Sequence, residues 1–235
     1  STGSIPFMHV VDSQMLAFNQ GTTRRGSYAA YMDISHPEIE EFLDVRKPTG
    51  GDVNRKSTNL HHGVMIGDDF MQLIENATRE PGFDDSWPLI DPHSGEVKKV
   101  IPAKTLWVKL IQNRVETGEP YIVFRDTVDE AVPEFQKELG LRVHQSNLCS
   151  EITLPTDKDR TAVCCLSSVN LEEYDEWKND DLFIPDLVRM LDNVLEHFIT
   201  NAPDQLSRAS YSAMRERLSL IHISEPTRRY AISYA

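Results

Sequence analysis

The chain has 235 residues, 40% of them hydrophobic, and carries a formal net charge of −13 at pH 7. This length and composition can fill the core of one large domain or two small ones. The negative charge argues against nucleic acid or an anionic membrane surface as the main partner, because both would repel an acidic protein.

The cysteine content favours a reducing compartment. Only three cysteines are present, and Cys164 and Cys165 are adjacent, which does not suit a disulfide framework. No segment approaches the roughly 20 apolar residues that span a bilayer, and the N-terminus lacks the pattern of a signal peptide. We therefore expect a cytoplasmic protein without a membrane segment. The missing initiating methionine indicates that the chain was cut from something longer.

The first quarter of the chain alternates loops with regular elements. Residues 19–27 are polar, with a glycine near each end, and predict a loop. A strand is expected at 28–34. Residues 35–47 predict a helix that Ser35 caps. A second loop follows at 47–59, which we interpret as a surface connection.

The middle of the chain continues the alternation. A buried strand is expected at residues 61–67 and a helix at 68–77. Apolar residues at helical spacing predict another helix at 104–118, which Gly118 ends. The next strand is expected at 120–124. The order of strand and helix predicts an α/β fold with a mainly parallel sheet.

Towards the C-terminus, an apolar run covers residues 161–171, and two helices are expected at 186–199 and 208–217. Residues 218–235 then lose the pattern. They look like translated sequencing adapter, so we expect a non-native tail there.

The most informative motif is "SNLCSEI" at residues 146–152. In an extended segment Asn147, Cys149 and Glu151 would share one face, because side chains alternate along a strand. A carboxylate can act as general base, an amide can hold a hydroxyl group, and a thiol can be nucleophile, metal ligand or redox group. The residues alone leave this active row and a structural cysteine equally open.

Other chemistries fit less well. Neither C-x-x-C nor H-x-x-x-H occurs, and neighbouring His61 and His62 would point to opposite faces of a strand. We therefore expect no metal site. What remains is redox or radical chemistry, with Cys164 or Cys165 as a second sulfur. Against this stands the usual role of a free cysteine as a small buried residue.

Further segments of the chain are informative together with "SNLCSEI": "AVCCLSSVNL", "STGSIPFM", "RRGSYAAYMDISHPEIEEFL", "NRKSTNLHHGVMI", "ETGEPYIVFRD" and "SRASYSAMRER". Together these segments resemble the catalytic large subunit of class I ribonucleotide reductase. They occur in the family's order and cover roughly residues 1–217. The resemblance implies a partial ten-stranded α/β barrel, with residues 1–217 as part of one catalytic domain truncated at both ends.

The resemblance also implies roles for individual residues. Cys149 matches the thiyl radical that removes the 3′ hydrogen of the ribose, and Glu151 matches the base for the 3′-hydroxyl proton. Asn147 matches the amide that binds the ribose hydroxyls. Cys164 matches one of two reducing cysteines, whereas Cys165 is interpreted as structural.

The early loop resembles the family's specificity loop, which lies between a deoxynucleotide effector and the substrate base. Its residues here are Gln20, Gly21, Thr22, Thr23, Arg24, Arg25 and Gly26. The glycines Gly21 and Gly26 would let it change shape.

For the whole enzyme, the resemblance implies ribonucleotide substrates, in particular diphosphates, and dNTP or ATP effectors. It also implies a homodimer, a small metal-and-radical β subunit, and thioredoxin or glutaredoxin acting through C-terminal cysteines outside this chain. The fragment itself would bind no cofactor and would be inactive alone. Two alternatives stay open: a cobalamin-dependent reductase, and a nucleotide-binding regulatory module without chemistry.

Overall fold

The structure is a computed structural model that describes residues 3–20, 24–217 and 219–224. The chain divides into two compact units, Ser1–Thr153 and Leu154–Ala235. Each unit is built around its own strands and helices. That residues 1–217 form part of a single catalytic domain stays a prediction.

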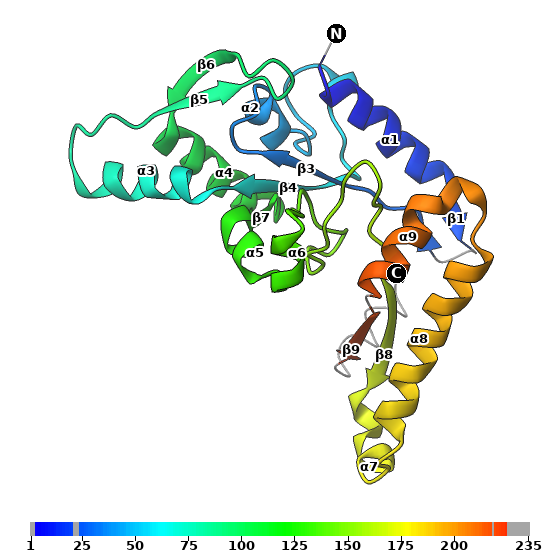
Figure 1. The fold of residues 1–235 in the computed structure, drawn as a ribbon. Helices are drawn as coiled ribbons and strands as arrows, with labels where there is room; N and C mark the ends of the chain where they lie inside the picture. Colours follow the sequence, from blue (N-terminus) through cyan, green and yellow to red (C-terminus); the bar gives the residue numbers. More distant parts are fainter. Residues whose placement is uncertain (1–2, 21–23, 218, 225–235) are drawn as a thin grey trace. The chain divides into compact units, whose positions relative to one another are not determined.

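A three-stranded parallel sheet is the centre of the first unit (Figure 1). Its strands are β3 (Ala29–Asp33), β4 (His61–Ile66) and β7 (Tyr121–Phe124), with β4 in the middle. Five of the six residues of β4 are buried, as expected of a central strand in a parallel sheet covered by helices. The strands predicted at residues 28–34, 61–67 and 120–124 and their parallel α/β arrangement are confirmed.

Helices and a hairpin complete the first unit. The helices are α1 (Ile5–Ala17), α2 (Ile39–Leu43), α3 (Asp68–Arg79), α4 (Ala103–Thr117), α5 (Arg125–Ala131) and α6 (Glu134–Glu138). The antiparallel hairpin consists of β5 (Ser86–Ile90) and β6 (Val97–Pro102). Helix α4 ends at Gly118, which has φ of 80° in the left-handed region, as its position predicts.

Three details differ from the sequence-based expectations. Ser35 does not cap a helix, because its N–H and Oγ both bond to Asp33 Oδ1; helix α2 begins only at Ile39. The sequence pattern also missed α1, whose apolar residues occupy every face rather than one. The hairpin was missed too, because Pro88 interrupts its first strand.

The core of the first unit lies between the sheet and its helices. Its fully buried large side chains come from these elements and the segments beside them, and include Phe42, Leu43, Leu60, Ile66, Phe70, Leu106 and Leu110. Phe70 packs edge-on against Trp87 of β5, with ring centroids 4.9 Å apart. Where the structure describes the first two loops, they contain short elements: β1 (Asn19–Gln20) pairs antiparallel with β2 (Arg24–Arg25), and a 3-10 turn covers Val53–Arg55.

The second unit pairs β8 (Cys165–Asn170) with β9 (Ser219–Ser224) in parallel. Its helices are α7 (Tyr174–Trp177), α8 (Phe183–Asn201) and α9 (Ser207–Glu216), with 3-10 turns at Leu171–Glu173 and Asp204–Leu206. Strand β9 gives regular structure to the start of the predicted tail, and residues 225–235 lie outside the described residues. The non-native origin of residues 218–235 stays a prediction. Within the described ranges, no helix is long and apolar enough to cross a membrane.

Candidate functional site

The segment with Cys149 is a tight turn. Leu148 and Cys149 form the turn itself, and Ser150 adopts φ of 64° while its N–H bonds to Asn147 O at 3.2 Å. The prediction that Asn147, Cys149 and Glu151 share one face of an extended segment is therefore wrong. An asparagine offers its side chain to nearby backbone groups, and this competes with strand formation.

The side chain of Asn147 closes the turn. Its Oδ1 accepts hydrogen bonds from the N–H groups of Glu151 and Ile152, each at 3.1 Å. Ser146 Oγ donates to Ile152 O at 2.7 Å. The structure records no hydrogen bond from Asn147 Nδ2 to another described residue, so this amide nitrogen can still donate to a ligand.

Two phenols of the central sheet lie near the turn. Tyr31 of β3 donates its hydroxyl to Asn147 O at 2.7 Å. Burial raises the pKa of Tyr31, and the charges of Glu151 and Cys149 act in the same direction. Burial likewise raises the pKa of Tyr121 of β7, again with contributions from Cys149 and Glu151. The turn thus presents an exposed thiol and an exposed carboxylate beside two protonated phenols.

A pocket of about 460 Å³ opens next to Tyr31 at the carboxyl ends of β3, β4 and β7. Arg125, which follows β7, pairs with Asp33 of β3 at 2.7 Å and with Asp126 at 3.1 Å. Gly67 makes room for this guanidinium, since a Cβ there would lie 2.3 Å from Arg125 Nη2. Sequence reasoning missed this cluster, although polar residues directly after parallel strands are a signal for a site.

A second polar cluster lies at the opposite end of the sheet, where β4 and β7 begin. Glu119, 8% exposed, bonds through Oε1 to His61 Nδ1 at 2.5 Å and through Oε2 to the backbone N–H and Nδ1 of His62 at 3.0 Å each. Arg46 lies 3.4 Å from the same carboxylate. Burial alone would raise the pKa of Glu119, but the bonds from His62 and His61 and the charge of Arg46 lower it from 4.5 to about 2.

We expect this carboxylate to make stability depend on pH. Because its pKa is lower in the folded state, its stabilisation is complete above the unfolded value of 4.5 and is lost as the pH falls towards 2. The thermal midpoint should therefore fall more steeply between pH 6 and pH 3, approximate limits set by this linkage, than in Glu119→Gln. Equal slopes in the two proteins would contradict this interpretation.

The predicted reducing thiol lies in the second unit. Cys164 directly precedes β8, and its Sγ lies 3.6 Å from the carbonyl oxygen of Cys165. Cys164 and Cys165 are both partly exposed, whereas Cys149 is exposed. The pairing of Cys164 with chemistry at Cys149 stays a prediction.

The predicted specificity loop is described only in part. Gly21, Thr22 and Thr23 lie outside the described residues, whereas Gln20 pairs with Arg24 at the start of a hairpin. Gly26 packs against the end of α1: its N–H bonds to Phe18 O at 2.8 Å, and a Cβ would lie 2.6 Å from Met15 O. This glycine therefore permits a close backbone approach. The nucleotide-binding role of the loop stays a prediction.

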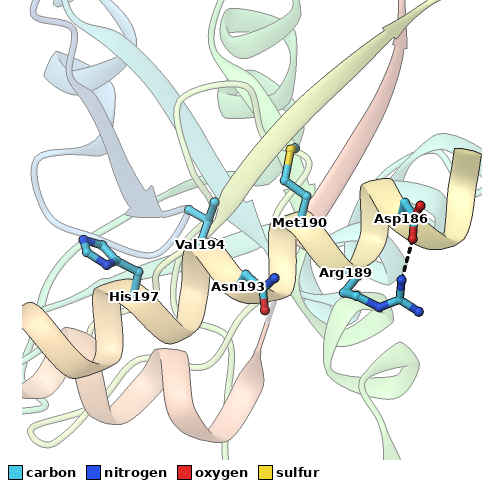
Figure 2. A pocket seen from close by; sticks show the side chains of 6 residues that line it. All are labelled: Asp186, Arg189, Met190, Asn193, Val194 and His197. Carbon is cyan, nitrogen blue, oxygen red and sulfur yellow. Dashed lines mark hydrogen bonds and ion pairs between the residues drawn. The ribbon is translucent and has the colours of Figure 1, made fainter.

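One further pocket lies on α8 of the second unit, with a volume of about 430 Å³. Figure 2 shows its lining residues, Asp186, Arg189, Met190, Asn193, Val194 and His197, all from this helix. Asp186 and Arg189 form an ion pair with each other. The pocket contains no thiol and offers no reactive group comparable to the Cys149 turn. In the described part of the chain, no cluster of three or more His, Cys, Asp or Glu residues is arranged to hold a metal ion.

Comparisons with known proteins agree with this α/β architecture. Residues 1–219 match the family model described as "Ribonucleotide reductase, barrel domain". A large-subunit relative from Frog virus 3 (isolate Goorha) is 52% identical over 220 residues, which cover 92% of this chain and 37% of the relative. The ribonucleoside-diphosphate reductase large subunit of Invertebrate iridescent virus 3 is 46% identical, with 92% of this chain and 42% of the relative covered.

A solved structure gives the same result. The α subunit of class Id ribonucleotide reductase from Actinobacillus ureae is 32% identical with a TM-score of 0.72, covering 95% of this chain and 37% of that one. The chain therefore belongs to the ribonucleotide reductase family. It corresponds to part of the barrel domain of the large subunit, which confirms both the resemblance and the partial α/β barrel. It spans about two fifths of the length of these relatives.

Proposed function

We propose that the chain is part of a large subunit that reduces ribonucleotides, in particular ribonucleoside diphosphates, to 2′-deoxyribonucleotides by a thiyl-radical mechanism. The observation that supports this most directly is the Cys149 turn. A thiol, a carboxylate and an amide occur there within one stretch of five residues, 147–151, inside the part of the chain that matches a reductase barrel domain. Such closeness suits a reaction on adjacent carbons of one sugar.

Each residue of the turn has a distinct task in this proposal. A thiyl radical at Cys149 takes the hydrogen atom from C3′ and becomes a thiol. The carboxylate of Glu151 accepts the proton of the 3′-hydroxyl. Since Asn147 Oδ1 is engaged with two backbone N–H groups, Nδ2 is the group left to donate to a ribose hydroxyl. Cys164 supplies one of the two thiols that are oxidised to a disulfide as the 2′-hydroxyl leaves.

The rest of the proposal concerns partners. The radical comes from a small β subunit, and effectors are dNTP or ATP bound near the loop of Gln20, Arg24, Arg25 and Gly26. The intact subunit forms a homodimer and is re-reduced by thioredoxin or glutaredoxin through cysteines outside this chain. It acts in DNA precursor synthesis in the cytoplasm, where thiols stay reduced. The isolated 235-residue fragment is inactive.

The proposal is tested by incubating the full-length subunit with its radical-generating partner, a dithiol reductant, an effector and a ribonucleoside diphosphate. Formation of 2′-deoxyribonucleotide supports it. A protein that binds effector but forms no deoxynucleotide would instead be a regulatory nucleotide-binding module.

Within this assay, Glu151→Gln is expected to lower turnover about 10²- to 10⁴-fold, the usual contribution of a general base. The amide keeps the shape of the side chain but cannot accept the 3′-hydroxyl proton. The matched control is Glu138→Gln, at the end of α6 on the exposed surface, which should leave turnover unchanged. Equal turnover in both variants would exclude Glu151 as the base.

A further inference from the structure

A row of three residues in register crosses the central sheet. The parallel register pairs Tyr31 of β3 with Gly63 of β4, and Gly63 with Tyr121 of β7. Residues in register on neighbouring strands point to the same face of a sheet. The row is thus a glycine between two tyrosines, on the face near the Cys149 turn.

Gly63 fixes where the ring of Tyr31 lies. A Cβ at position 63 would lie 2.4 Å from Cε1 and 2.6 Å from Cδ1 of Tyr31, far inside van der Waals contact. The ring therefore occupies the space that a side chain on β4 would fill. Any larger residue at position 63 must displace this ring.

The hydroxyl of Tyr31 reaches Asn147, whose side chain closes the turn. It donates to Asn147 O at 2.7 Å, and the same oxygen accepts the N–H of Ser150. The side-chain oxygen Oδ1 of Asn147 accepts hydrogen bonds from the N–H groups of Glu151 and Ile152. Because burial raises the pKa of Tyr31, this phenol remains a hydrogen-bond donor at neutral pH.

We propose that Tyr31 is a positioning residue for Cys149: lying over Gly63, it ties the Cys149 turn to the central sheet through its hydrogen bond to Asn147. This inference rests on the proposed function, because it concerns the same thiol. Tyr31 itself touches no reacting atom. Its contribution is to keep the thiol at one place relative to the substrate, where a displacement of about 1 Å can cost 10²-fold in rate.

The test is Tyr31→Phe in the full-length subunit, assayed with its radical-generating partner. We expect turnover to fall about 10- to 100-fold. Hydrogen exchange at the amides of Ser150, Glu151 and Ile152 should become about 10-fold faster, since one hydrogen bond that anchors them is lost. The matched control is Tyr28→Phe, which removes a half-buried hydroxyl just before the same strand; it should change neither quantity.

A second variant tests the geometry. Gly63→Ala places a methyl group in the path of the Tyr31 ring and should reproduce both effects of Tyr31→Phe. If the two act through one hydrogen bond, the double variant should be no worse than the more impaired single variant.

The outcomes separate the two proposals. Unchanged turnover in Tyr31→Phe, or reduced turnover without faster exchange at the turn, would overturn the positioning role. The variant Cys149→Ser distinguishes failure of the positioning role from failure of the thiyl mechanism. If that variant keeps full turnover, the thiyl mechanism itself fails. If it is inactive while Tyr31→Phe behaves as wild type, only the positioning role fails.

Discussion

Replacing Cys149 with serine is expected to reduce deoxynucleotide formation by the full-length subunit to the background of the assay. The thiol gives up its hydrogen atom far more readily than a hydroxyl group, so serine cannot supply a comparable radical. The turn should persist, because its hydrogen bonds come from Asn147, Ser146 and the backbone. Effector binding should therefore be retained, and it can be measured by equilibrium titration of a deoxynucleotide.

The control for this variant is Cys165→Ser, a similar change at a partly exposed thiol on β8. Turnover close to wild type is expected there. Turnover by Cys149→Ser at the level of Cys165→Ser would remove Cys149 from the mechanism. Loss of both turnover and effector binding would show that the substitution disturbs the fold, and Cys149→Ala would then replace it.

The largest loss of stability is expected from Glu119→Gln. The pKa of Glu119, about 2 against 4.5, corresponds to roughly 3 kcal/mol of stabilisation at neutral pH. The amide keeps the shape but gives up the charge that faces His61 and Arg46. We expect the thermal midpoint of the first cooperative transition to fall by roughly 5–10 °C.

A nearby surface charge provides the control. Glu116 also forms an ion pair, 2.9 Å from Lys47, but its side chain is 58% exposed. Exposed pairs contribute little, so Glu116→Gln should shift the midpoint by no more than about 2 °C. Similar shifts of the thermal midpoint in the two variants would show that the buried Glu119 cluster stabilises the fold no more than an exposed ion pair does.

The elements predicted from sequence were those with one strong local signal. The apolar run at His61–Ile66 and the glycine at position 118 each define a structure by themselves. Helix α1 gave no such signal because its apolar residues surround it. The Cys149 turn was mispredicted because the alternation of its residues fits a strand, whereas the decisive interaction is the side chain of Asn147 bonding to its own backbone.

The residues that surround the Cys149 turn were even less predictable from the sequence than the turn itself. The hydrogen bond between Tyr31 and Asn147 joins residues 116 positions apart, and the glycine that makes room for it lies on a third segment. Arg125 and Asp33 likewise meet only because three parallel strands end at one edge. Such contacts follow from the register of the sheet, which the local pattern of residues does not reveal.

The long distance in sequence between Tyr31 and Asn147 has a consequence for folding during synthesis. The turn needs Tyr31, which lies 116 positions before Asn147, so their hydrogen bond can form only after this whole stretch has left the ribosome. Until then the Cys149 turn lacks its hydrogen bond to the central sheet. All groups of the turn and its sheet contacts lie in Ser1–Thr153, and domains generally fold as units, the N-terminal ones first during synthesis. The Cys149 turn therefore reaches its described geometry only after the three strands of the central sheet have been synthesised.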